Sequence, residues 1–172
     1  MRVKLPLVIC HDEGHEDPVT DVITLNKNNQ RIEHLGLPLL EAKQLLSTTQ
    51  RHLLRQQVAA CLDTCSDCPD CGTPLKLKAR ASRSFRTLFG TFKFDNPRLD
   101  HCDCTRRTTS SCRPRSALLT ASVAPELLYR EAKWSSLVSY GMSLDALKDF
   151  LPLEVTRDVK TMRSDTLKVA TR

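Results

Sequence analysis

Two short cysteine pairs constrain this chain more than any other feature of its sequence. Cys68 and Cys71 stand in CPDCG, and Cys102 and Cys104 stand in CDC about thirty residues later. A structural zinc site takes four tetrahedral ligands, which short turns such as these can supply in pairs. Gly72 provides the left-handed backbone that such a turn often needs. The spacing therefore predicts a structural zinc ion bound by these four thiolates, with a zinc-ribbon-like sheet between the two pairs.

Iron–sulfur and redox chemistry fit these residues less well. Cys65, Cys68 and Cys71 match the first three positions of a ferredoxin-type motif, but Leu75 stands where the fourth cysteine is needed. A redox CxxC pair belongs at a strand-to-helix turn, whereas this pair follows a helical pattern and leads into strands. A CxxC redox protein remains the third-ranked alternative.

The other cysteines and the histidines leave some choices open. Cys61 or Cys65 could replace one assigned ligand, although their spacing at a helix end is equally well explained by packing. His101 is either a substitute ligand or a surface residue. Cys10 and Cys112 are expected to be buried or incidental thiols.

The N-terminal sequence indicates a cytoplasmic protein. Its apolar run of six residues, LPLVIC, is too short for a secretory signal, and no segment is long enough for a membrane span. Cytosolic thiols stay reduced, so the eight cysteines favour metal binding or burial over disulfides.

Positive charge is concentrated in one region of the chain. Residues 1–60 carry seven basic and seven acidic side chains, whereas residues 71–116 carry eleven basic and three acidic ones. Residues 117–172 carry eight basic and seven acidic side chains. A basic block around the cysteines indicates a polyanionic partner, of which nucleic acid is the commonest in the cytosol; the alternative is a solvated surface.

Strand patterns occur at the start of the chain and between the cysteine pairs. Residues 2–10 and 18–25 are β-branched runs that should pair as a hairpin. LKLKAR, at 75–80, alternates as a strand, and the apolar phase of SFRTLFGTFKF flips across Gly90, which predicts a bulge or tight turn. Between these modules, residues 38–62 have helical periodicity, with Leu39, Leu46 and Leu53 seven residues apart. We expect this long helix to cover a small sheet or to pair with a second subunit.

Three helices are expected near the end of the chain. The first should run from Pro125 to about Tyr140 with Gly141 as its cap, and the second should begin at Ser143 and end near Phe150. The third fits residues 158–170. The last two, over 143–170, would form a helix-turn-helix unit.

The third helix has an apolar and a polar side. Its apolar side carries Val159, Met162 and Val169. Its polar side is either a solvated surface or a set of contacts to phosphates and base edges. The DNA-contacting residues predicted there are Arg157, Lys160, Thr161, Ser164 and Lys168, joined by Arg106 and Arg107 from the basic loop.

No catalytic constellation stands out, since GxSxG and phosphate-loop motifs are absent from the sequence. The predicted fold class is α+β in three parts. These are a β-hairpin with a long helix at 1–60, a zinc-ribbon-like basic module at 61–116 and a helix-turn-helix module at 117–172.

With these residues assembled, the chain resembles the ISKra family of bacterial insertion-sequence transposases. The likeness lies in CPDCG, SFRTLFGTFKFDNPRL, HCDC, PELLYREAKWSSLVSYGMSLDALKDFLP and VKTMRSDTLKVA. The resemblance implies DNA transposition by a DDE-type enzyme that uses carboxylates and divalent metal, in a bacterial cytoplasm at the nucleoid. In that family the catalytic domain lies downstream of such a segment, so no catalytic carboxylate is carried over to this chain.

The resulting hypothesis is a DNA-binding N-terminal part of a transposase that recognises the element's terminal repeats in double-stranded DNA and has no catalytic centre of its own. Its further partners would be a second copy or full-length transposase. The alternative is a stand-alone, non-enzymatic repressor of transposition that occupies the same repeats.

Overall fold

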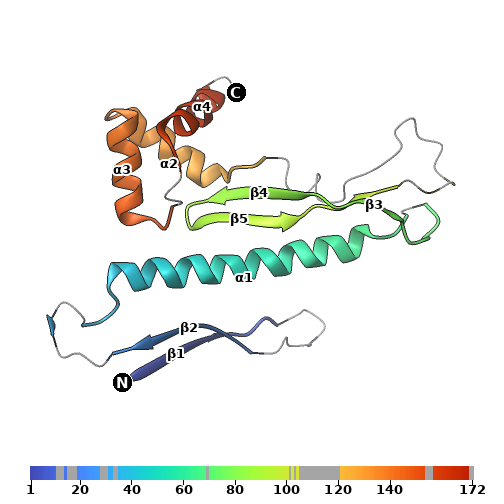
Figure 1. The fold of residues 1–172 in the computed structure, drawn as a ribbon, viewed down its shortest axis with the longest axis horizontal. Coiled ribbons are helices and arrows are strands. Elements are labelled where there is room, and N and C mark those ends of the chain that lie inside the picture. Colours follow the sequence, from blue (N-terminus) through green and yellow to red (C-terminus); the bar gives the residue numbers. More distant parts are fainter. Residues whose placement is uncertain are drawn as a thin grey trace.

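A computed structural model shows a mixed α/β fold, consistent with the expected class (Figure 1). Within the described part of the chain there are four helices and three two-stranded antiparallel sheets. The described residues are 1–10, 14, 19–27, 31–32, 35–68, 70–100, 102, 104, 121–153 and 157–170.

The N-terminal hairpin consists of β1 (Arg2–Leu7) and β2 (Thr20–Asn26) and confirms the predicted pairing. Alternate residues of β1 are half-buried, as period-2 patterning requires when one face of a strand is covered. The register shifts between Leu5 and Pro6, where proline cannot donate a ladder hydrogen bond. The hairpin therefore has one half-buried face, and the next element of the chain, a helix, packs against the hairpin.

Helix α1 (Leu39–Cys65) runs between this hairpin and the β4–β5 hairpin (Figure 1). Leu54 and Val58 are buried and pack with Phe92 and Phe94 of β5 into one apolar core. Burial of these aromatic and aliphatic side chains stabilises the packing of α1 on β5, at about 25 cal/mol per Å² of apolar area removed from water. The helix therefore joins the N-terminal hairpin to the cysteine-containing part of the chain.

The leucines that predicted α1 do not form its buried face. Leu39, Leu46 and Leu53 are 51%, 44% and 41% exposed. The core side of α1 is instead set by the i, i+4 pair Leu54 and Val58, which meets β5. The heptad spacing thus identified the helix, but it did not identify the side that packs.

The second hairpin pairs β4 (Ser82–Thr87) with β5 (Gly90–Asp95) through a two-residue turn. Gly90 has φ +127°, a region that side chains with a Cβ rarely adopt. The Thr87 hydroxyl accepts the N–H of Phe89 at 3.1 Å and donates to the carbonyl of Gly90 at 3.2 Å. The predicted tight turn at Gly90 is confirmed. Beside this hairpin, β3 (Leu77–Ala79) pairs with β6 (Arg98–Leu99).

The C-terminal helices are α2 (Pro125–Ser135), α3 (Tyr140–Phe150) and α4 (Val159–Ala170), and they pack on one another. Leu144 and Leu147 of α3 and Met162 of α4 form their core. The segment before α2 is bound to β4: Ala124 N–H donates to Arg86 O at 2.7 Å, and Arg86 N–H donates to Ser122 O at 2.9 Å. These bonds fasten the three-helix unit to the β4–β5 hairpin.

The predicted boundary between the first two of these helices is wrong. α2 ends at Ser135, and the Ser136 hydroxyl donates at 2.7 Å to the carbonyl of Lys133, the acceptor that the N–H of Leu137 would use if the helix continued. Ser139, rather than Ser143, caps α3 by accepting the N–H of Met142. Gly141 lies in the first turn of α3, so it caps nothing. The predicted ends of α3 at Phe150 and of α4 at 170 agree with the structure. Among the described residues, none of the helices has the length and apolar character of a membrane span.

Candidate metal centre and basic helix face

Four cysteine side chains converge where the turn after α1 meets the β3–β6 pair. The Sγ atom of Cys68 lies 3.5 Å from that of Cys104. Cys71 Sγ lies 3.4 Å from Cys102 Sγ and 3.3 Å from Cys104 Sγ. All four sulfurs lie within 4.8 Å of one another, so the predicted ligands come together in a group that could hold a metal ion.

A tight turn brings Cys68 and Cys71 to the same side of the chain. Gly72 has φ +68°, which confirms its predicted left-handed backbone, and its N–H donates to Cys68 O at 2.8 Å. Cys68 N–H donates in turn to Thr73 O at 2.9 Å. The second pair is delivered by β6, because the bond from Asp100 N–H to Lys76 O, 2.9 Å, extends the β3–β6 ladder towards it.

The surroundings of Cys71 favour its thiolate form. Hydrogen bonds from the hydroxyl and the backbone of Thr73, and then the neighbouring Cys104 and Cys102 thiols, lower the pKa of Cys71 to about 6. Cys68 is only 3% exposed, whereas Cys71 is open to solvent. Metal binding requires deprotonated thiols, so Cys71 is prepared for coordination near neutral pH.

Of the remaining cysteines, the structure describes the side chains of Cys10 and Cys61, and neither belongs to this group. Cys10 is exposed rather than buried, and Cys61 is half-buried and not among the four clustered residues. The side chain of Cys65, together with Cys112 and His101, lies outside the described residues. The choice of Cys61 as a substitute ligand is therefore not supported by its position.

The outer side of α4 is basic. Its side chains line a shallow open hollow on the surface, and Ser164 and Leu167 lie between cationic residues there. The lining residues are Lys160, Arg163, Ser164, Leu167 and Lys168. Their spacing of three and four residues places them on one helix face.

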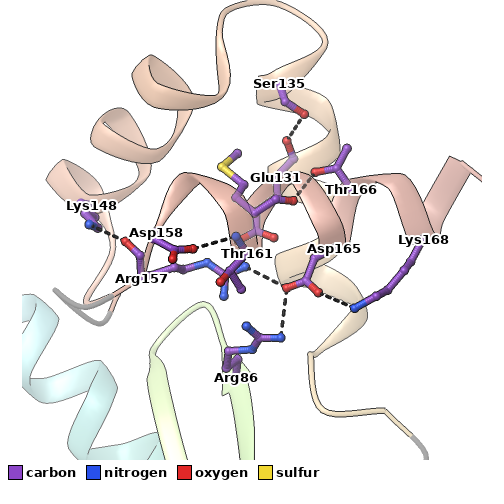
Figure 2. A network of polar contacts seen from close by, with 11 residues as sticks. Arg86, Glu131, Ser135, Lys148, Arg157, Asp158, Thr161, Asp165, Thr166 and Lys168 are labelled. Atoms are coloured by element: carbon purple, nitrogen blue, oxygen red, sulfur yellow. Dashed lines mark hydrogen bonds and ion pairs between the residues drawn. The ribbon is translucent and has the colours of Figure 1, made fainter.

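The inner side of α4 carries a buried group of ion pairs (Figure 2). Arg157 lies just before the helix and is paired with Glu131 of α2 and with Asp165 of α4, the latter at 3.3 Å. Glu131 and Asp165 are 0% and 1% exposed. Burial raises the pKa of Glu131, and the positive charge of Arg157 opposes that rise. Such a buried group costs desolvation energy, which its charge pairs offset only when all partners stay in place.

The Asp165 carboxylate also forms ion pairs with two further basic side chains. Arg86 of β4 lies 3.0 Å from it, and Lys168 of α4 lies 3.1 Å from it. Figure 2 shows the carboxylate between these side chains, with the hairpin below it and the helices around it. Asp165 therefore ties α4 directly to β4 through Arg86, and indirectly to α2 because its partner Arg157 is also paired with Glu131.

The prediction that Arg157 lies on the exposed polar side of the last helix is wrong, because its residue is only 8% exposed and its guanidinium is engaged by two carboxylates. The physical reason is that Arg157 precedes the first helical residue, so helical phase does not apply to it. Its carbonyl accepts a hydrogen bond from Lys148 Nζ at 2.9 Å, which further fixes its position.

The other predicted DNA contacts differ in their environment. Lys160 and Ser164 are exposed, and Lys168 is exposed but bound to Asp165. Thr161 is half-buried, and its N–H donates to Asp158 Oδ1 at 2.7 Å, which caps α4. Hydrogen bonding to Thr161 lowers the pKa of Asp158. Arg106 and Arg107 lie outside the described residues.

Two residues of this outer face, Arg163 and Leu167, are not among the DNA contacts predicted from the sequence. Arg163 is exposed, and no ion pair or hydrogen bond is found for it within the described part of the chain. Its position could have been inferred from the sequence, because Arg163 lies three residues after Lys160 and four before Leu167 and therefore shares their helix face.

Comparisons of the chain with protein-family models, with curated proteins and with solved structures found no match.

Proposed function

We propose that this chain is a double-stranded DNA-binding protein, the DNA-recognising part of an insertion-sequence transposase. A zinc ion held by the four clustered cysteines stabilises its basic module, and the outer face of α4 contacts DNA. The observation that carries the proposal is the asymmetry of α4: buried ion pairs and Met162 hold its inner side, while Lys160, Arg163 and Ser164 are exposed.

The donor set favours zinc over other metals. Four thiolates suit a tetrahedral, soft-ligand site, in which Zn–S distances near 2.3 Å place the sulfurs roughly 3.8 Å apart. The close sulfur pairs, at 3.3 to 3.5 Å, need to open only by a few tenths of an ångström. With all four positions taken by protein, the ion has no place for substrate and serves the fold.

α4 has the dimensions of a groove-binding helix. Its 12 residues span about 18 Å, and an α-helix with its side chains, about 10 to 12 Å in diameter, fits lengthwise into a major groove about 12 Å wide. α2 and α3 are joined by residues 136–139, a helix-turn-helix-like spacing, while residues 151–158 between α3 and α4 form a longer connection than the simplest motifs have. We therefore assign α4 as the outer helix of a three-helix unit that is itself fastened to the hairpin.

The test is duplex binding by zinc-loaded full-length chain. Fluorescence anisotropy would use the element's candidate terminal repeats, a scrambled duplex of equal length and a titration of salt. We expect one zinc per chain, tighter binding to the repeats and an affinity that falls steeply with salt. Metal-free protein that stays fully folded and zinc-loaded protein without duplex affinity at low salt would both contradict the proposal.

A further inference from the structure

The outer face of α4 carries a polar and an apolar side chain, Ser164 and Leu167, among its basic residues, whereas binding to phosphates requires only the basic ones. Lys160 and Lys168 stand towards the two ends of the helix, whereas Arg163 and Ser164 occupy its middle turn. Leu167 is 51% exposed between them. A leucine has no polar atom for a phosphate, and lysines alone would supply the sequence-independent attraction.

Resting on the DNA-binding function proposed above, we infer that Arg163 is a specificity-determining residue that reads guanine in the major groove. The guanidinium offers a planar fork of donors that matches the O6 and N7 acceptors of guanine. Lysine carries the same charge on a single point and lacks that fork. Leu167, one turn further along, contacts the methyl group of a thymine.

Arg163 differs from the other arginine of this region in its availability. Arg157 is engaged by Glu131 and Asp165, and its guanidinium is buried. Arg163 is exposed and makes no ion pair among the described residues, so it can offer its donors to a ligand without breaking a protein contact. The ammonium group of Lys168, by contrast, is already engaged in an ion pair with Asp165, at 3.1 Å.

The spacing also predicts the relation between the two bases. Arg163 and Leu167 are separated by about 6 Å along the helix axis, at 1.5 Å per residue. Base pairs are stacked at about 3.4 Å, so a helix lying along the groove places the guanine and the thymine about two base-pair steps apart.

The experiment is a selection from a randomised duplex library, followed by anisotropy measurements on selected and unselected duplexes. It compares zinc-loaded wild-type chain with Arg163→Lys, Leu167→Ala and Arg55→Lys, the last being an exposed arginine of α1 that serves as the matched control. We expect a guanine in the selected site. Arg163→Lys should reduce discrimination at that position about tenfold or more, with binding of unselected duplex and its salt dependence nearly unchanged.

Leu167→Ala should relax only the thymine preference, and Arg55→Lys should resemble wild type. A wild-type chain that binds duplexes without sequence preference, or an Arg163→Lys variant that keeps the preference for guanine, overturns the inference while leaving DNA binding intact. Absence of any duplex affinity at low salt overturns the proposed function itself. Equal thermal unfolding of all four proteins would show that the exposed substitutions leave the fold unchanged.

Discussion

Arg86 Nη2 lies 3.0 Å from Asp165 Oδ2, and this contact joins the β4–β5 hairpin to the helix with the basic outer face. The same carboxylate oxygen accepts from Arg157 at 3.3 Å. Because these ion pairs hold the inner side of α4, its outer side has a fixed orientation relative to the hairpin. The orientation of α4 therefore depends on charge pairs on its inner side and not on the residues of its basic outer face.

Asp165→Ala should be strongly destabilising, by about 3 kcal/mol, because it removes one of the two carboxylates that neutralise the buried Arg157. Urea unfolding followed by circular dichroism would measure the loss. The control is Asp149→Ala, an exposed carboxylate of α3, for which a change of about 0.5 kcal/mol or less is expected. Equal effects of the two substitutions would show that the ion-pair group contributes nothing specific.

The Glu131 carboxyl should make stability depend on pH. Its pKa is raised in the folded chain, chiefly by burial, above the ordinary value of 4.5. The folded state then binds the proton more tightly than the unfolded state, so this contribution to stability is lost as pH rises above 4.5. The difference in unfolding free energy between wild type and Glu131→Gln should fall over that range.

Asp158→Asn provides a comparison of opposite sign. Hydrogen bonds from Thr161 lower the Asp158 pKa, so its contribution is present above 3.8 and lost as pH falls below that value. Urea titrations of the three proteins between acidic and neutral pH would separate the two effects. Parallel curves for wild type and Glu131→Gln would contradict the role given to burial.

Local features of this chain could be predicted from its sequence, and long-range charge pairing could not. Gly72 and Gly90 were identified because each sits in a short turn whose geometry depends on neighbouring residues. The cysteines came together as expected although Cys68 and Cys104 are 36 residues apart, because two short cysteine pairs with metal-ligand spacing can be recognised in a sequence. Glu131 and Arg157 belong to different segments, so no periodicity could reveal that they would be buried as partners.

A side chain at Gly90 should strain the backbone of the β4–β5 turn. Gly90→Ala forces a Cβ into φ +127°, although the neighbouring atoms leave ordinary contact distances of 3.5 Å or more. The expected loss is therefore conformational, about 1 to 2 kcal/mol. Gly141→Ala is the matched control, because that glycine lies in α3 and should gain up to about 1 kcal/mol in helix stability. Differential scanning calorimetry would check both, and a stabilising Gly90→Ala would contradict the turn geometry.

Zinc binding should release fewer protons than the number of thiol ligands. Cys71 has a pKa of about 6 and is already thiolate at pH 7.5, so at most three of the four cysteines still carry protons. Calorimetric titration in buffers of different ionisation enthalpy would count the protons. Cys68→Ser should abolish tight binding, and Cys10→Ser, at an exposed thiol outside the cluster, should not. Release of four protons at that pH would contradict the lowered pKa.

The zinc-loaded state also separates the structural role from the CxxC redox alternative. Coordination blocks the nucleophilic sulfur, so Cys71 should resist alkylation by iodoacetamide until a chelator is added. Mass spectrometry of the alkylated peptides would locate the modified residues, with Cys10 as an internal reference for an exposed thiol. A Cys71 thiol that reacts equally fast with and without bound zinc would favour redox chemistry.

Lys160→Ala should weaken binding to all duplexes by a similar factor. Lys160 is an exposed point charge at the first turn of α4, suited to a phosphate rather than to a base edge. Loss of one phosphate contact should reduce the slope of log affinity against log salt by about 1, with no change in sequence preference. Arg55→Ala removes the same charge from the exposed surface of α1 and should leave the slope unchanged. Anisotropy titrations at several salt concentrations measure both slopes, and equal slopes for the two variants would place the DNA elsewhere on the molecule.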